Sequence, residues 1–384
     1  MSKNDLSGTW PLCLANLISI YTLDLSQIPI SLLPFFNHSK LKYLNCRENE
    51  IHTDIDVPNL TPKFQLETLY LSGQREGGVF PKFLYYQRII PQDLTVECIS
   101  LSGLILSNNN LQGQIFPRQA NCKELRLLRL DGNQFIGSVP YSILNCTGLQ
   151  VLDVRDNHRT GSIPSWIRNV TFLQVFGLSK NNLFGKLPSS FGPLKIISIY
   201  LSKNRMEGSS MNAFYNCSES MTLDLSDNYF TRRIPKWTGK LPQLRFLLLG
   251  NNNLEGEMPI QQIESLDLSY NNLNGNIPQL TQLNFLTVFS VAHNNLSGNT
   301  PEIVAQFATF DKSSYEENPF LCGPPLSKSC FSSSIMPRVS KEDKKDHKRD
   351  GGFMDMDAFY MSFLISYAIE LLTIAAVLYI NPYW

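Results

Sequence analysis

One asparagine recurs through the chain at a nearly constant spacing, and this feature restricts the fold more than any other. Successive members of the series are 24, 24, 24, 23, 24, 24, 19 and 23 residues apart. A fixed period of this length is typical of a repeat protein, in which each turn of the chain contacts only its neighbours. Weaker frames extend toward the amino end, so the sequence predicts about thirteen turns of one solenoid. The framework residues are Asn109, Asn133, Asn157, Asn181, Asn204, Asn228, Asn252, Asn271 and Asn294, and the weaker frames are centred on Gln74, Asn49, Ile28 and Asn4.

Each framework asparagine follows a Leu-x-Leu pair, as in Leu128 and Leu130 before Asn133. This alternation predicts a short strand whose leucines point inward. Such a strand cannot bury its apolar side alone, so neighbouring turns must stack as a parallel sheet on the concave face. With strands ~4.8 Å apart, about thirteen turns give a face on the order of 60 Å long. That length suits a polymer, peptide or protein partner better than a metabolite.

The residues after the strand favour a bend. The asparagine amide both donates and accepts hydrogen bonds, so it can satisfy backbone groups that the bend would bury. A glycine stands four residues after the asparagine in every regular frame except the one with Arg232, and a proline follows seven residues after it in most frames. Glycine permits a tight bend, and proline sets φ at the start of the convex segment. Two steps break the period, one of 35 residues between Gln74 and Asn109 and one of 19 between Asn252 and Asn271.

Composition and motifs argue against catalysis. The chain carries 33 basic and 33 acidic residues, so it has no global charge for binding nucleic acid. It contains no Gly-rich phosphate loop, HRD or DFG motif and no GxSxG motif. Repeat-phase carboxylates at Asp153, Asp224 and Asp267 are expected to face open solvent, where nothing raises a pKa for acid catalysis. We therefore expect a non-enzymatic protein without a cofactor.

The cysteines fall into two kinds. Cys122, Cys146 and Cys217 each follow an asparagine at the same repeat phase, which favours buried apolar filling. No CxxC motif occurs and the histidines are scattered, so no metal site is expected. Cys322 and Cys330 bracket a proline-containing loop after the last regular repeat.

An apolar run near the carboxyl end predicts one membrane-spanning helix. Ala358 to Ile380 contains Glu370 as its only charge and is long enough to cross a ~30 Å hydrocarbon layer. Ser362 and Ser366 share a helix face with Glu370, which makes that face a candidate contact with another spanning helix. Local snorkelling of Glu370, or a tolerated charge, is the alternative. Residues 331–357 before the run form a charged juxtamembrane linker.

The repeat resembles the leucine-rich repeat, in its plant-specific form. The LxGxIP half occurs as LFGKLP at Leu183 to Pro188 and as LNGNIP at Leu273 to Pro278. From Gln262 onward, QIESLDLSYNNLNGNIP, FSVAHNNLSGNTPE, VAQFATFDKSSYEENPFLCGPPLSKSC and AVLYINPYW resemble the carboxyl end of plant leucine-rich-repeat receptor-like proteins. The resemblance implies an α/β-type solenoid of 24-residue repeats and one transmembrane helix, without a kinase domain. It also implies a plasma-membrane location with the solenoid outside, and a single-pass adaptor receptor kinase as partner.

The resemblance also implies a cap disulfide between Cys322 and Cys330, with free thiols as the alternative. Two departures from the family stand out. Met1 falls inside a repeat with no signal peptide before it, and no basic tail follows Ile380, so we expect a member truncated at both ends and internally shortened. The resulting plan is degenerate repeats over 1–74, an irregular interruption over 75–103, regular repeats over 104–301, a cap over 302–330, the linker over 331–357, the spanning helix over 358–380 and a short tail over 381–384.

Side chains between the paired leucines and just after them should point away from the core. This pattern puts mixed charges and aromatic residues on the concave surface, a composition that suits a peptide or protein ligand. The expected ligand-facing residues are Arg129, Asp131, Arg155, Asp156, Lys180, Tyr200, Lys203 and Tyr270. Three Asn-x-Ser/Thr sequons, at Asn145, Asn169 and Asn216, each lie twelve residues before a framework asparagine on the convex side. We expect them to accept glycans if the chain is secreted.

Two classes of function remain open. The first is a membrane-anchored receptor-like protein that recognises an extracellular peptide, protein or glycan in defence or development and signals through a partner kinase. The alternative is a non-signalling interaction, inhibitor or decoy protein, or the product of a partial gene. The lysines of the linker would favour a cytosolic solenoid with a tail anchor by the positive-inside rule, whereas the family resemblance implies the opposite orientation.

Overall fold

The computed structural model describes most of the repeat region and none of the carboxyl-terminal segment. The described residues are 19–24, 35, 37–47, 63–64, 66–72, 77–79, 101–113, 115, 122–192, 194–236, 238, 241–258, 263–278, 286–303 and 305–330. The chain divides into two units, Met1–Ser332 and Ser333–Trp384. The second unit contains the predicted membrane run, which therefore lies outside the described residues.

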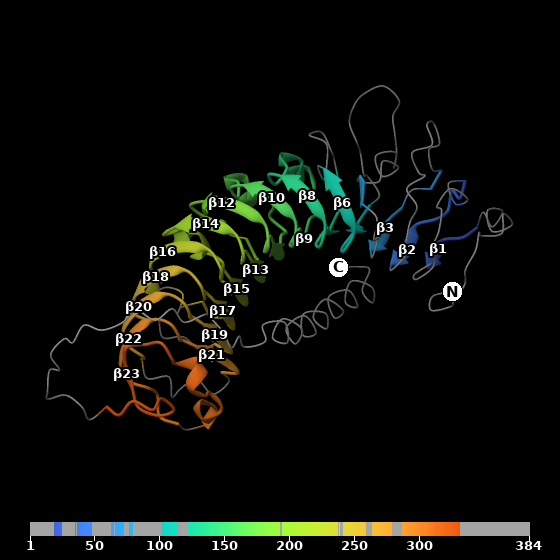
Figure 1. The fold of residues 1–384 in the computed structure, drawn as a ribbon. Coiled ribbons are helices and arrows are strands. Elements are labelled where there is room, and N and C mark those ends of the chain that lie inside the picture. Colours follow the sequence, from blue (N-terminus) through green and yellow to red (C-terminus); the bar gives the residue numbers. More distant parts are fainter. Residues whose placement is uncertain are drawn as a thin grey trace. The chain divides into compact units, whose positions relative to one another are not determined.

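Twelve parallel strands form the long sheet along the inner side of the arc in Figure 1. Consecutive turns contribute consecutive strands, and each pairs with the next in register, as Leu128 does with Leu152. The strands are β1 (Thr22–Asp24), β2 (Tyr43–Arg47), β3 (Thr68–Ser72), β5 (Gly103–Ile105), β7 (Leu127–Arg129), β9 (Val151–Asp153), β11 (Val175–Gly177), β13 (Ser198–Tyr200), β15 (Thr222–Asp224), β17 (Phe246–Leu248), β19 (Ser265–Asp267) and β21 (Val288–Ser290).

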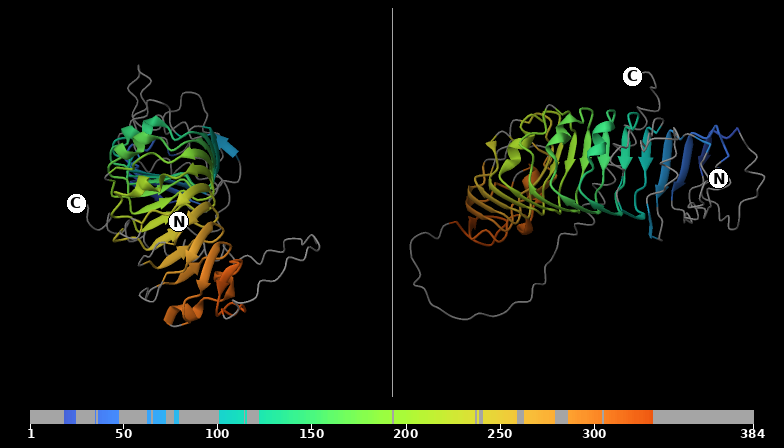
Figure 2. Two further views of the ribbon diagram at one scale, coloured as in Figure 1. Left: turned by 90° about the vertical axis from the view of Figure 1, so that its left-hand side faces the viewer. Right: turned by 90° about the horizontal axis from the view of Figure 1, so that it is seen from above.

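A second sheet runs beside the first, and the sequence pattern did not predict it. It has eleven strands, nine of which are formed by the residues that follow a framework asparagine, and the two further views of Figure 2 show the strands stacked turn upon turn. The strands are β4 (Gly77–Val79), β6 (Asn110–Gly113), β8 (Gln134–Gly137), β10 (His158–Gly161), β12 (Asn182–Lys186), β14 (Arg205–Gly208), β16 (Tyr229–Arg233), β18 (Asn253–Gly256), β20 (Asn272–Asn276), β22 (Asn295–Asn299) and β23 (Phe320–Cys322).

Short 3-10 helices occupy the convex segments, where an α/β-type repeat would carry α-helices. They are η4 (Tyr141–Asn145), η5 (Ser165–Asn169), η6 (Ser210–Phe214) and η8 (Ala305–Thr309), whereas η9 (Lys312–Ser314) lies beside β21 at the end of the inner sheet. Five residues or fewer are too short for a stable α-helix, and prolines precede η4 and η5. The described repeats therefore form a β-solenoid with two parallel sheets, which corrects the expectation of an α/β-type repeat.

The core follows the Leu-x-Leu prediction. The inward residues of successive turns, such as Leu128, Leu152, Phe176, Ile199 and Leu223, are almost completely buried in one continuous cluster. Burial of each such side chain contributes roughly 1.5–3 kcal/mol relative to exposure in water. Cys122, Cys146 and Cys217 are buried, as their repeat phase predicts.

The framework asparagines act as the sequence predicts, by holding the backbone of two adjacent turns. Nδ2 of Asn133 donates to the carbonyls of Leu130, 3.0 Å away in its own turn, and Leu106, 2.8 Å away in the preceding turn. Its Oδ1 accepts from the amide of Leu111 at 3.0 Å. Asn318 makes the same three kinds of bond, to Tyr315, Val291 and Leu296, and so adds a turn that the sequence analysis did not count.

The two irregular steps keep the strands paired. Across the step of 35 residues, Leu69 of β3 pairs with Leu104 of β5, and β4 pairs with β6. Across the step of 19, Leu247 of β17 pairs with Leu266 of β19. Both sheets therefore continue across the irregular interruption predicted for residues 75–103, of which residues 80–100 lie outside the described part of the chain.

Candidate ligand-binding face

The eight expected ligand-facing residues divide between two places. Arg129 and Tyr200 end strands β7 and β13, and Asp131 and Arg155 lie two residues beyond β7 and β9, so these four lie at or just after the ends of inner-sheet strands. The other four have φ between 51° and 54° and form the bend that precedes a framework asparagine, at the edge of the sheet. This second group is Asp156, Lys180, Lys203 and Tyr270. The eight residues thus form two surfaces instead of the single one expected. We call the first four residues the inner face and the second four the bordering row.

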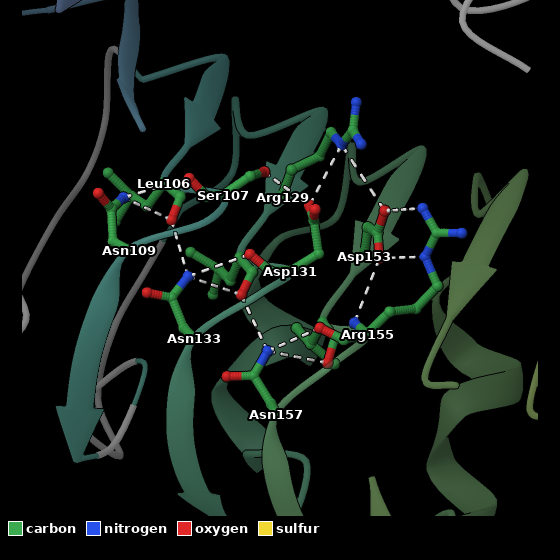
Figure 3. Close-up of polar contacts among 11 residues, drawn as sticks. Leu106, Ser107, Asn109, Arg129, Asp131, Asn133, Asp153, Arg155 and Asn157 are labelled. Carbon is green, nitrogen blue, oxygen red and sulfur yellow. Dashed lines mark hydrogen bonds and ion pairs between the residues drawn. The ribbon is translucent and has the colours of Figure 1, made fainter. Parts of the chain in front are cut away.

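A chain of ionic contacts on the inner face joins Arg129 and Asp131 to Asp153 and Arg155 (Figure 3). Nε and Nη2 of Arg155 donate to the two carboxylate oxygens of Asp153 at 2.8 and 2.7 Å. Nε of Arg129 lies 3.6 Å from both Asp131 and Asp153. The Arg155 guanidinium carbon lies 5.2 Å from the ring centroid of Tyr200, the geometry of a cation–π contact.

Burial and charge set the pKa values of the two carboxylates in opposite directions. Burial by itself would raise the pKa of Asp153, but the charge and hydrogen bonds of Arg155, followed by the charge of Arg129, lower that pKa below its ordinary value. Burial, followed by the negative charge of Asp153, raises the pKa of Asp131 although Ser107 donates to it at 2.6 Å. Asp153 is therefore the ionised centre that fixes both arginines.

The expectation that repeat-phase carboxylates face open solvent was wrong. The side chain of Asp153 is only 1% exposed, because two arginines and the neighbouring strands surround it. Asp224 is also buried, accepts hydrogen bonds from Ser202 at 2.6 Å and Ser226 at 2.7 Å, and has a pKa raised by burial. Burial likewise raises the pKa of Asp267, which accepts from Ser269 at 2.7 Å. Serine hydroxyls of the same or the preceding turn hold these two carboxylates, so their geometry is that of structural side chains.

The sequence analysis missed Gly177, which makes room for the ion pair. A Cβ atom at this position would lie 2.9 Å from Oδ1 of Asp153 and 3.2 Å from Cγ of Arg155. The other turns carry larger residues there, such as Tyr200 on the next strand, so only a comparison between turns could have indicated it.

The bordering row places side chains of consecutive turns next to one another. The ring of Tyr270 stacks on His293 with centroids 4.0 Å apart, and 55% of Tyr270 is exposed. Farther along the row, Gly132 leaves a shallow hollow beside Asn108, Asp156 and His158. The bordering row therefore presents a stacked aromatic pair and a shallow polar hollow to solvent.

Other predicted features have defined places. The side chains of Asn145, Asn169 and Asn216 are exposed, the first two in η4 and η5 and the third just after η6. Cys322 and Cys330 form a disulfide with Cα atoms 5.2 Å apart. Ser362, Ser366 and Glu370 lie outside the described residues.

Within the described part of the chain, no helix has the length and apolarity needed to cross a membrane. In the same part, no cluster of three or more His, Cys, Asp or Glu side chains could hold a metal ion.

Comparison with known proteins identifies the repeat and its relatives. Two family models, both described as leucine-rich repeat, match residues 195–254 and residues 148–170, 172–194 and 262–283. The chain is 41% identical over 81 residues to Cuscuta receptor 1 of Solanum lycopersicum. This alignment covers 21% of this chain and 7% of that receptor. It is 32% identical over 133 residues to polygalacturonase inhibitor 1 of Arabidopsis thaliana, covering 33% of this chain and 32% of the inhibitor. The chain thus spans less than a third of the length of either relative.

A solved structure shares the architecture over a longer range. The Arabidopsis receptor kinase HAESA, solved in complex with the peptide hormone IDA and the co-receptor SERK1, superposes with a TM-score of 0.59 at 25% identity. The match covers 82% of this chain and 60% of HAESA. Together with the repeats and the two sheets, these likenesses identify the repeats of this chain as leucine-rich repeats, similar to those of plant receptor-like proteins.

Proposed function

We propose that the chain is the ligand-recognition part of a membrane-anchored receptor-like protein and that it binds an extracellular peptide on its inner face. The observation that carries the proposal is the pair of partly exposed guanidinium groups, with Arg129 at 24% and Arg155 at 19% side-chain exposure. Asp153 holds both groups in place, so they can bond a ligand carboxylate or backbone carbonyl with little loss of side-chain entropy. The likeness to a peptide-hormone receptor supports a peptide over the other ligands that we considered, a protein or a glycan.

A peptide selection tests this proposal. A random peptide library would be selected on the full chain and then compared on a variant with Arg129→Gln, Asp153→Asn and Arg155→Gln. These changes remove the two arginines together with Asp153, so Asp153 is not left as a buried carboxylate without its arginines, and Asp131 keeps its hydrogen bond from Ser107. Reversal of the two arginine charges alone would leave Asp153 unpaired. We expect enriched peptides to lose at least about tenfold in affinity, equivalent to about 1.4 kcal/mol. Arg168→Gln, on the exposed surface of η5, is the matched control. Peptides that bind the triple variant as tightly as the native chain would move the site elsewhere.

We further propose that signalling passes through a partner receptor kinase, since the sequence has no kinase motif of its own. The predicted spanning run carries Ser362, Ser366 and Glu370 on one face, and a polar contact between helices contributes ~1 to 2 kcal/mol. Replacing all three by leucine should reduce co-purification of a kinase from plant membranes while improving membrane insertion. Equal recovery of the kinase with the native chain and the variant would indicate that the partner contact lies in the solenoid.

The likeness to a polygalacturonase inhibitor favours one second candidate, a non-signalling binder of a secreted enzyme. Ligand-dependent phosphorylation of a co-purified kinase would support the receptor. Tight binding of a secreted polygalacturonase without an associated kinase would support the inhibitor.

A further inference from the structure

One turn of the solenoid carries an arginine where its neighbours carry core side chains. Arg159 lies on β10, two residues after framework Asn157, at the position that Phe135 and Leu183 occupy in the adjacent turns. Like those two residues it is buried, with 2% exposure. A guanidinium group thus replaces an apolar side chain inside the stack.

Backbone carbonyls satisfy only one end of this guanidinium. Nη1 donates to the carbonyl of Ile136 at 2.7 Å and to that of Ser138 at 3.1 Å. Nε and Nη2 are buried and have no hydrogen-bond acceptor among the described residues. The hydroxyl of Ser142 is also buried and has no hydrogen-bond partner among the described residues. Ser142 follows Ser138 by four residues along the chain. The turn whose carbonyls accept from Nη1 of Arg159 thus also holds a buried hydroxyl without a hydrogen-bond partner in the described part of the chain.

Arg159 stays charged under physiological conditions. Burial lowers its pKa to about 10, which is still well above neutral pH. No carboxylate of the described residues forms an ion pair with it; the arginine pairs there involve Arg129, Arg155 and Arg245. A buried cation without a counter-charge is strongly unfavourable, and a neutral water molecule would satisfy donors without compensating the charge.

We propose that Arg159 and Ser142 bind a small monovalent anion of the size of chloride inside the solenoid. The close packing of protein interiors favours a single-atom anion over a carboxylate or phosphate, and Nε, Nη2 and the Ser142 hydroxyl supply its donors. The anion would stabilise the turns around β8 and β10, which also contain Arg129 and Arg155. This site is independent of the peptide-binding proposal, because its residues face the core.

Thermal unfolding tests the anion site. The full chain in a mild detergent would be unfolded in sodium chloride and in sodium gluconate at equal ionic strength. We expect chloride to raise the Tm by about 2 °C. A protein of this size shows a shift of this order when the ligand concentration is roughly ten times the Kd of a site present only in the native state. Arg159→Leu should abolish the difference between the two salts, and Ser142→Ala should reduce it. Arg168→Leu, at an exposed position of η5, should leave it unchanged.

Two results would overturn the proposal. An equal Tm of the native chain in both salts would mean that water or nothing occupies the site. A chloride dependence that persists in Arg159→Leu would place the bound anion elsewhere. If Arg159→Leu fails to fold, the comparison of Ser142→Ala with the native chain decides, because loss of one hydroxyl removes a donor and leaves the packing nearly intact.

Discussion

Arg155 donates two hydrogen bonds to the carboxylate of Asp153, with nitrogen–oxygen distances of 2.8 and 2.7 Å, on the inner face of the solenoid. The two residues stand on either side of the inward-facing Val154, so both side chains leave the same surface. Because Asp153 is almost fully buried, it anchors the partly exposed Arg155 in one orientation. The pair therefore holds Arg155 in a fixed orientation on the surface that we propose as the ligand site.

Gly177 should be essential for this pair. In Gly177→Ala the new methyl group would lie 2.9 Å from Oδ1 of Asp153, so the pair must shift. We expect a loss of about 1–2 kcal/mol in unfolding free energy, measured by urea denaturation. Gly103→Ala on β5 is the control, because its methyl group would lie at an ordinary 3.4 Å from Thr68. A similar effect of both substitutions would show that glycine is required for another reason.

The buried carboxylates predict opposite responses to pH. The raised pKa of Asp224 means that the folded state binds this proton more tightly than the unfolded state does. Ionisation of Asp224 therefore lowers the free energy of unfolding as the pH rises above 3.8 and through the folded-state pKa. Asp224→Asn should therefore unfold at a higher temperature than the native chain at pH 7, and the difference should shrink below pH 3.8.

Asp153→Asn serves as the counterpart of that experiment. The pKa of Asp153 is lowered, so its contribution to stability is complete above 3.8 and disappears as pH falls through the still lower folded pKa. This variant should be less stable than the native chain at pH 7, with a difference that fades in acid. If both variants shifted Tm in the same direction at pH 7, the assignment of opposite pKa shifts would be wrong.

Framework asparagines should be costly to remove. Asn157→Ala breaks bonds to the carbonyls of Leu130 and Val154 and to the amide of Phe135, and it leaves these backbone groups buried. At about 1 kcal/mol for each bond, with a further cost for unsatisfied groups, we expect a loss of about 2–4 kcal/mol in chemical denaturation. Asn253→Ala removes an exposed asparagine from β18 and should change stability by less than about 0.5 kcal/mol.

Glycosylation of the convex side remains a prediction that exposure supports. Asn145 and Asn169, with Thr147 and Thr171 two residues later, are exposed, as are Asn216 and Ser218. After secretion from plant cells, deglycosylation should increase gel mobility, and each Asn→Gln change should remove one glycan from the mass spectrum. Asn295 provides a contrast, because Ser297 of its sequon is partly buried and its hydroxyl donates to Asn276. Efficient modification at Asn295 but not at the other three would contradict the assignment of the convex side.

The sequence by itself determined the repeat, its inward leucines and the role of its asparagines. These follow from local rules, since Leu-x-Leu alternation selects a buried side and the amide of Asn133 or Asn157 both donates and accepts hydrogen bonds at a buried bend. The same phase argument correctly predicted that Cys122, Cys146 and Cys217 are buried.

Contacts between turns decided the rest. The second sheet exists because four- or five-residue segments such as β8 and β10 pair when stacked, although none has a strand signal alone. Asp153 is buried because Arg129 lies in the preceding turn and Gly177 in the next, 24 residues away on either side. Such neighbours meet through the register of the stack, and a pattern read within one repeat does not contain that register.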